Sequence, residues 1–382
     1  MIEQSLHNLI EYIERENYRG WDPYDGLMSP LFKLPVLSKN KRLRFLGQQF
    51  FKRFPLNLRR LLFVPKGYNP VTIGLCIQGY SYMYALPNAN KDILMAKISH
   101  LISELKKLIP SGYSGACWGY DFDWAARRAS IPAYQPTIVA TGIITNSLFE
   151  CHRITGNTDA LELCKSATRF VLLDINRTIE GDGICFSYSP FDNQQVYNAS
   201  IKGARLLSQV YSITKEESLR STAKQVVEYV ASKQNSDGSW FYANNSTSRW
   251  IDNYHTGYIL DCLSEYILCT GDNSYKDILA KGYKYYKDNF FDLDFTPKFY
   301  SDKSKPLDCT AAGQSLLTLT RFADQELAKK VAEVTISEMQ DKRGYFYFRK
   351  YKRYTTKISF MRWSNAWMMA GLSYLLFNQN QN

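Results

Sequence analysis

The sequence predicts an all-α protein with the fold of a single (α/α)6 toroid, a closed ring of six helical hairpins. Nearly continuous apolar segments recur every 52–65 residues, and each of the first five precedes a more amphipathic segment. Helix 2–16 has no partner before it and segment 361–377 has none after it, so pairing them closes the ring. No linker rich in Pro, Gly or Ser divides residues 1–382, which are therefore expected to form one domain. The apolar segments begin near Val71, Pro136, Tyr197, Tyr254, Cys309 and Met361.

The two kinds of segment are expected to form two layers of helices. The apolar helices would form the inner ring, buried on all sides, and the amphipathic helices would form the outer ring. Residues 218–230 illustrate the outer kind, because Leu219, Ala223 and Val226 share one face and Arg220 and Lys224 fall on the other. Short turns such as Thr-Gly-Asn at 155–157 and Thr-Gly-Asp at 270–272 would lead from an inner helix to the next outer helix.

The connections from outer back to inner helices are long and aromatic, and they predict short β-hairpins at one end of the ring. All seven tryptophans fall at this end or within two helical turns of it. A mouth of indoles, carboxylates and guanidiniums suits sugar rings, because aromatic faces stack on C–H faces and charged groups bind hydroxyls. Under the alternative interpretation, the aromatic side chains only plug the ring. Four connections contain an aromatic-x-Tyr pattern, namely Trp118/Tyr120, Phe186/Tyr188, Trp240/Tyr242 and Tyr345/Tyr347.

Candidate functional residues gather at the same end. His255 is the one histidine of four placed there, and it is either an acid–base group near neutral pH or a buried, hydrogen-bonded side chain. Asp252 and Asp308 also fit helix N-caps. The candidate catalytic residues are Asp123, Tyr188, Asp252, Tyr254 and His255. The candidate substrate-binding residues are Trp21, Asp22, Asp25, Trp118, Tyr120, Asp121, Trp124, Arg127, Trp240, Tyr242, Trp250, Asp308, Arg362 and Trp363.

Two chemistries fit these residues. Epimerisation or β-elimination at a uronate needs a base, a proton donor and a cation on the carboxylate. The base would be His255 or a tyrosine, the donor Tyr120, Tyr188 or Tyr254, and the cation Arg127 or Arg362. Hydrolysis instead needs two carboxylates about 5–5.5 Å or 6.5–9.5 Å apart. Asp123 facing Asp252 or Asp308 would provide that pair.

The sequence gives no sign of a metal or nucleotide site. About 17 residues of helix, roughly 25 Å, separate Cys151-His152 from the loop that carries Cys117, which is too far for shared zinc coordination. Neither a P-loop nor a dinucleotide-binding glycine pattern is present. The eight cysteines contain no CxxC pair and are expected to be reduced, structural thiols. We therefore expect no metal, no cofactor and no nucleic-acid partner.

The positive charge is concentrated in two segments. Residues 26–91 contain eleven Lys or Arg and no acid, and residues 342–382 contain eight and no acid. A basic insertion at about 26–70 includes Lys41–Phe54, in which Leu43, Leu46, Phe50 and Phe54 form an apolar stripe on a helix. Such a segment predicts peripheral contact with an anionic membrane through about residues 39–66, or else the stripe packs on the toroid. The acidic N-terminus is unlike a signal peptide, so a cytoplasmic protein at the inner membrane face is expected.

Four motifs resemble those of bacterial proteins from capsule and exopolysaccharide gene clusters, over nearly the whole chain. They are GWDPYDGL at 20–27, CWGYDFDW at 117–124, PTIVATG at 136–142 and IDNYHTGY at 251–258. Some of those proteins are named delta-aminolevulinic acid dehydratase, an activity that needs a β/α-barrel. The chain is more distantly similar to glucuronyl C5-epimerases, unsaturated glucuronyl hydrolases and polysaccharide lyases.

This resemblance implies a toroid that acts on a uronate-containing oligo- or polysaccharide, free or lipid-linked, but it assigns no catalytic residues. Two other functions stay open. One is a non-catalytic glycan-binding or scaffold subunit of the polysaccharide machinery. The other is a terpenoid- or prenyl-handling toroid, because residues 234–240, QNSDGSW, resemble the Gln-Trp repeat of terpenoid cyclases.

Overall fold

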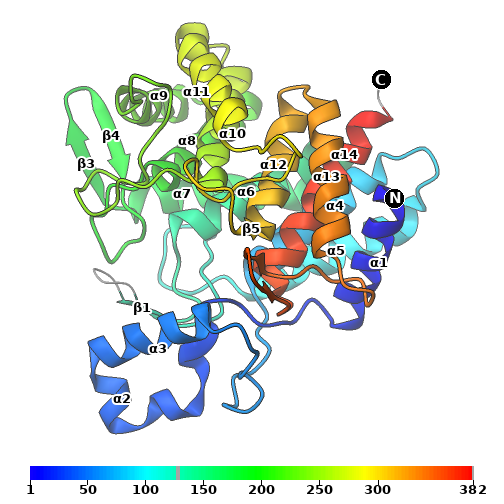
Figure 1. The fold of residues 1–382 in the computed structure, drawn as a ribbon. Helices are drawn as coiled ribbons and strands as arrows, with labels where there is room; N and C mark the ends of the chain where they lie inside the picture. Colours follow the sequence, from blue (N-terminus) through cyan, green and yellow to red (C-terminus); the bar gives the residue numbers. More distant parts are fainter. Residues whose placement is uncertain (126–129, 381–382) are drawn as a thin grey trace.

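The computed structural model describes residues 1–125 and 130–380, and in them two concentric layers of helices form a ring (Figure 1). Each inner helix packs on the next, and α14 packs back on α4, which closes the ring. The inner helices are α4 (Pro70–Tyr84), α6 (Ile138–Thr155), α8 (Tyr197–Thr214), α10 (Asn253–Thr270), α12 (Cys309–Arg321) and α14 (Trp367–Gln379). The outer helices are α1 (Ile2–Arg15), α5 (Lys91–Lys107), α7 (Thr158–Leu173), α9 (Glu217–Ser232), α11 (Lys276–Asn289) and α13 (Gln325–Met339).

The order of elements confirms the predicted (α/α)6 toroid. Helix α1 packs on α13 and α14, as the pairing of the two unpartnered segments predicts. A π-helical turn, Met361–Ala366, begins the last inner segment, and a 3-10 turn, η3 (Asn273–Tyr275), precedes α11. The inner helices are buried almost throughout, whereas the outer helices expose one face.

Local sequence explains where several inner helices begin and end. Side chains of Asn69, Thr137, Asp252 and Asp308 accept hydrogen bonds from backbone N–H groups in the first turns of α4, α6, α10 and α12. At the other end, the glycines of two of the predicted short turns stop α6 and α10. Gly156 and Gly271 have φ values of 72° and 71°, which a residue without a Cβ adopts at no steric cost.

Short strands occupy the outer-to-inner connections, as predicted. Strand β1 (Trp124–Ala125) pairs with β2 (Ser130–Ile131), and β3 (Arg177–Glu180) pairs with β4 (Gly183–Phe186). A three-stranded antiparallel sheet joins β5 (Leu307–Asp308), β6 (Arg349–Lys350) and β7 (Thr355–Thr356). Because these connections all lead to the N-termini of inner helices, they surround one end of the ring, which we call the mouth.

The basic segment 26–70 lies outside the ring, beside the mouth (Figure 1). It contains the 3-10 turns η1 (Asp25–Met28) and η2 (Pro30–Lys33) and the helices α2 (Pro35–Lys39) and α3 (Lys41–Arg53). Helix α3 buries Gln48 and Phe51, whereas Leu46 and Phe50 of the predicted apolar stripe are 59% and 47% exposed. The interpretation in which those two side chains pack on the toroid is therefore wrong.

All eight cysteines are free thiols, and seven of them are buried. Within residues 1–125 and 130–380, no group of three His, Cys, Asp or Glu side chains is placed to hold a metal ion. In the same residues, no helix combines the length and apolarity needed to cross a bilayer.

Candidate active site

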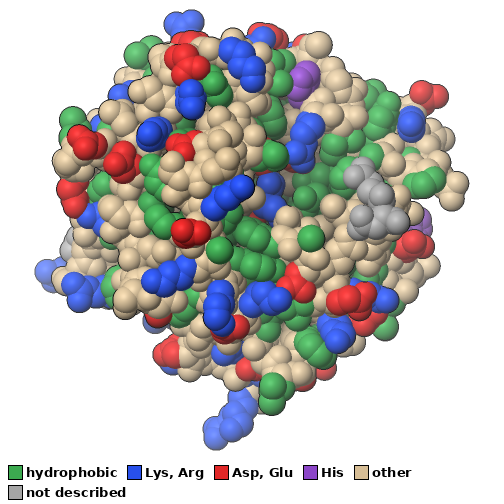
Figure 2. Space-filling view, turned by 90° about the horizontal axis from the view of Figure 1, so that it is seen from above, with side chains coloured by type: hydrophobic (Ala, Val, Ile, Leu, Met, Phe, Trp, Pro, Cys, Tyr) green, Lys and Arg blue, Asp and Glu red, His purple; other side chains and the backbone are tan. Residues whose placement is uncertain are grey.

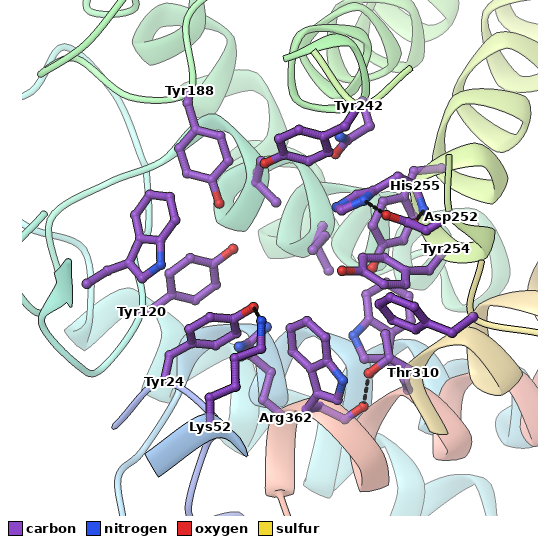
Figure 3. Close-up of a pocket in the computed structure, with 18 of the residues that line it drawn as sticks. Tyr24, Lys52, Tyr120, Tyr188, Tyr242, Asp252, Tyr254, His255, Thr310 and Arg362 are labelled. Atoms are coloured by element: carbon purple, nitrogen blue, oxygen red, sulfur yellow. Dashed lines mark hydrogen bonds and ion pairs between the residues drawn. The ribbon is translucent and has the colours of Figure 1, made fainter. Parts of the chain in front are cut away.

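A cavity opens at the mouth, and ten of the predicted site residues line it (Figure 3). Its volume is about 210 Å³, below the roughly 300–1,000 Å³ of pockets for drug-sized ligands. The ten residues are Tyr120, Trp124, Tyr188, Tyr242, Trp250, Asp252, Tyr254, His255, Arg362 and Trp363.

Asp252 and His255 form a hydrogen-bonded pair at the start of α10. The Oδ1 atom of Asp252 caps the helix by accepting from the His255 backbone N–H at 3.0 Å, and Oδ2 lies 2.7 Å from Nδ1 of the His255 ring. The Trp250 indole N–H also donates to Oδ2, at 3.1 Å. A carboxylate that accepts these bonds holds the ring proton on Nδ1, so Nε2 of neutral His255 is the atom able to take up a proton.

Tyrosine hydroxyls surround the cavity. The rings of Tyr120, Tyr188 and Tyr242 project from three connections and that of Tyr254 from the first turn of α10, and all four direct their hydroxyls toward its centre (Figure 3). Burial raises the pKa of each of these four hydroxyls above its ordinary value. They therefore stay protonated near neutral pH and can donate hydrogen bonds into the cavity.

Arg362 and Lys52 bring positive charge to the cavity wall. Arg362 donates from Nε and Nη2 to the two carboxylate oxygens of Asp22, at 2.7 and 2.9 Å, and its guanidinium lies 4.8 Å from the centre of the Tyr120 ring. The Lys52 ammonium donates to the Tyr24 hydroxyl at 2.6 Å. Asp22 does not line the cavity, but it holds Arg362, which does.

Three predicted tryptophans also lie away from the cavity. Trp118 and Trp240 are buried in the core, and their indole N–H groups donate to the Leu105 and Val230 carbonyls, each at 2.9 Å. Trp21 donates to the Val64 carbonyl at 3.1 Å and so fastens the insertion to the ring. None of the three lines the cavity, and contact with a substrate stays a prediction for them. The positions of these three tryptophans favour the alternative interpretation, in which the aromatic side chains have a structural role.

Four predicted aspartates do not line the cavity and pair with other side chains. Asp123, the predicted hydrolytic partner of Asp252 or Asp308, does not line the cavity, and neither does Asp308, so neither pair forms there. Burial raises the pKa of both Asp25 and Asp121 to about 7. The pairs are Asp25 with Arg59 at 2.7 Å, Asp121 with Asn69, Asp123 with Arg44 at 2.9 Å, and Asp308 with Arg349 at 2.5 Å. The remaining predicted residue, Arg127, lies outside the described residues.

Several residues of the wall were not predicted from the sequence, including Lys52, Asn198 and Trp367. Asn198 stands in the first turn of α8, at the level of His255 in α10 and Thr310 in α12, so the helical repeat itself could have predicted it. Its buried amide nitrogen has no hydrogen-bond partner among the described residues, which leaves a donor for a ligand. Lys52 comes from the insertion, and no repeat marks its position.

Comparison with solved structures identifies the architecture. The chain has the (α/α)6 toroid fold. Cellobiose 2-epimerase from Bacillus thermoamylovorans is 12% identical over 83% of this chain and 90% of its own, with a TM-score of 0.64. A family 76 mannosidase from Bacteroides thetaiotaomicron is 11% identical over 100% and 99% of the two chains, also at 0.64.

A heparin-specific unsaturated glucuronyl hydrolase is similar as well, at 13% identity over 80% of this chain and 85% of its own, with a TM-score of 0.58. At such low identities these similarities establish the fold alone. No protein-family model and no curated protein matches the sequence.

Proposed function

We propose that this protein is a carbohydrate-active enzyme that transfers a proton at a sugar carbon, with His255 as the acid–base group. The reaction would be epimerisation or β-elimination at a uronate unit. The observation that carries the proposal is the imidazole in the cavity wall, whose Nδ1 atom is held by buried Asp252 among protonated tyrosines. This arrangement provides a base and several separate donors around one cavity.

The chemistry follows from the charges of the wall. Nε2 of His255 would take the proton from the carbon next to the uronate carboxylate, and negative charge would then develop on the carboxylate oxygens. Lys52 and Arg362 would stabilise that charge. A tyrosine hydroxyl on the opposite side would return a proton to the carbon, which inverts it. In the elimination, the bond to the neighbouring glycosidic oxygen breaks instead, and the donor protonates that oxygen.

Glycoside hydrolysis is the second candidate, and the carboxylates argue against it. Both mechanisms of hydrolysis need two carboxyl groups that flank the scissile bond. Among the described residues of the wall, Asp252 is the carboxylate present, and it is hydrogen-bonded to His255 and Trp250. Because a mannosidase and a glucuronyl hydrolase have the same fold, the test below includes hydrolysis as an outcome.

The substrate we propose is a uronate-containing bacterial surface polysaccharide, or its lipid-linked precursor. The resemblance to capsule and exopolysaccharide proteins supports this class, as do sugar-acting enzymes of the same fold. The stacked rings of Tyr242 and Trp250, with centroids 4.5 Å apart, would meet one sugar face. The open amide of Asn198 would bind a hydroxyl. This mixture of hydroxyls and charges suits a sugar better than a terpenoid.

The test is to incubate the protein with uronate-containing and neutral polysaccharides in D2O and to record proton NMR spectra. We expect deuterium at the carbon next to the carboxylate, or an unsaturated uronate, with the acidic glycans only. New reducing ends without deuterium or unsaturation would refute proton transfer and support hydrolysis. Binding of a glycan without any conversion would instead support a glycan-binding subunit.

A further inference from the structure

The insertion, residues 26–70, is fastened to the mouth through its inner side. Arg59, almost fully buried, pairs with Asp25, and Arg44 pairs with Asp123 at 2.9 Å. The Gln48 side chain accepts a hydrogen bond from the Ala125 backbone N–H at 2.8 Å. Lys52 reaches the cavity itself. These contacts hold α3 in a fixed position beside the opening.

The outer side of the insertion is apolar and open. Arg42, Leu46, Phe50 and Arg53 of α3 follow one another at helical spacing, and all four are exposed. Of the eighteen exposed large hydrophobic side chains of the described chain, eight belong to residues 31–63. Clusters of this kind mark sites that bind another surface, whereas isolated exposed apolar residues are ordinary.

The charge of the insertion limits the kinds of partner that this surface can bind. Six of its basic side chains are exposed, and none of them forms an ion pair with a described carboxylate. No Asp or Glu occurs between residues 26 and 91. The molecule's upper face is different, since Lys and Arg are interspersed there with Asp and Glu (Figure 2). The six exposed cations are Lys33, Lys39, Lys41, Arg42, Arg53 and Arg60.

We propose that the insertion is a membrane-docking surface that binds bilayers containing anionic lipid. Apolar side chains such as Leu46 and Phe50 would enter the interface between headgroups and acyl chains, and the flanking cations would lie at the level of the lipid phosphates. Because α3 also supplies Lys52 to the cavity, docking would hold the mouth close to the bilayer. The inference does not depend on the reaction proposed above.

The test is sedimentation of the full chain with phosphatidylcholine vesicles that contain or lack phosphatidylglycerol. We expect binding to the anionic vesicles only, weakened by added salt. Lys41→Gln/Arg42→Gln should lower the partition coefficient about 25-fold, because each cation near the surface contributes a factor of about five. Leu46→Ser/Phe50→Ser should abolish binding. Leu268→Ser is the control: Leu268 is 66% exposed near the far end of α10, and its removal should change nothing.

All four substituted side chains in the insertion are exposed, so their melting temperatures should match the wild type. If the Leu46/Phe50 variant melts lower, the Lys41/Arg42 variant decides, because those side chains lie at the exposed start of α3. Absence of wild-type binding to phosphatidylglycerol vesicles would overturn the proposal. Binding of both variants as strong as that of the wild type would overturn it as well. A wild-type dimer that becomes monomeric in the Leu46/Phe50 variant would also overturn it, since the apolar surface would then cover a second copy.

Discussion

Replacing Asp22 by Ala should destabilise the fold by about 3–5 kcal/mol, the cost of leaving one buried charge of an ion pair without its partner. The side chains of Arg362 and Asp22 are 7% and 5% exposed, and two charge-assisted hydrogen bonds of 2.7 and 2.9 Å join them. Removing both charges should cost less than removing one, so Asp22→Ala/Arg362→Met should be more stable than Asp22→Ala. The assay is urea unfolding followed by tryptophan fluorescence, with the midpoint converted through the slope.

The matched control is Asp288→Ala. Asp288 pairs with Lys284 on α11, with side chains 54% and 77% exposed, and a pair of this kind contributes at most about 0.5 kcal/mol. If Asp22→Ala lowers the free energy of unfolding by less than about 1 kcal/mol, the reasoning is refuted, because the Asp22–Arg362 pair would then behave as an exposed pair. A double variant less stable than Asp22→Ala would refute it equally.

Four further changes have definite expected outcomes. Trp118→Ala should lower the free energy of unfolding by about 3–5 kcal/mol, whereas Trp250→Ala, at a 39% exposed wall position, should weaken glycan binding in calorimetry and leave the melting temperature unchanged. Burial raises the pKa of Asp121 from 3.8 to about 7, so its contribution to stability is present below pH 4 and lost as pH rises through 7; Asp121→Asn should flatten the melting temperature over that range. Deleting residues 1–18 should lower the melting temperature, because α1 buries Leu6, Leu9 and Ile13 in the ring, and an unchanged value would contradict closure.

The fold was predictable because the apolar segments that specify it recur at regular intervals in the sequence. Six apolar segments at similar spacing can bury themselves only by packing on one another, and the two unpaired terminal helices then close the ring. Short turns that contain Gly156 and Gly271 indicated one end of the ring, and the long aromatic connections indicated the other. The exposed outer side of α3 was harder to predict, since its packing face uses Gln48 beside Phe51 rather than the apolar stripe.

The site was predictable only in part. Tyr254 and His255 lie in the first turn of inner helix α10, where the helical repeat predicts residues at the mouth, and they line the cavity. Residues in the loops have no such register, so the sequence could not distinguish Tyr120, in the wall, from Trp118, two positions earlier in the core. Lys52 was not predicted because its position depends on how the insertion packs against the ring.

The central claim is that His255 transfers the proton, and the rate of deuterium incorporation from D2O into a uronate glycan tests it most directly. The rate should fall by about 10²–10⁴-fold in His255→Gln, and it should fall in Asp252→Asn as well, because that carboxylate fixes the ring through a 2.7 Å hydrogen bond. Asp123→Asn, which alters a carboxylate outside the cavity, should retain the rate. Equal rates in the wild type and a folded His255→Gln variant would contradict the claim.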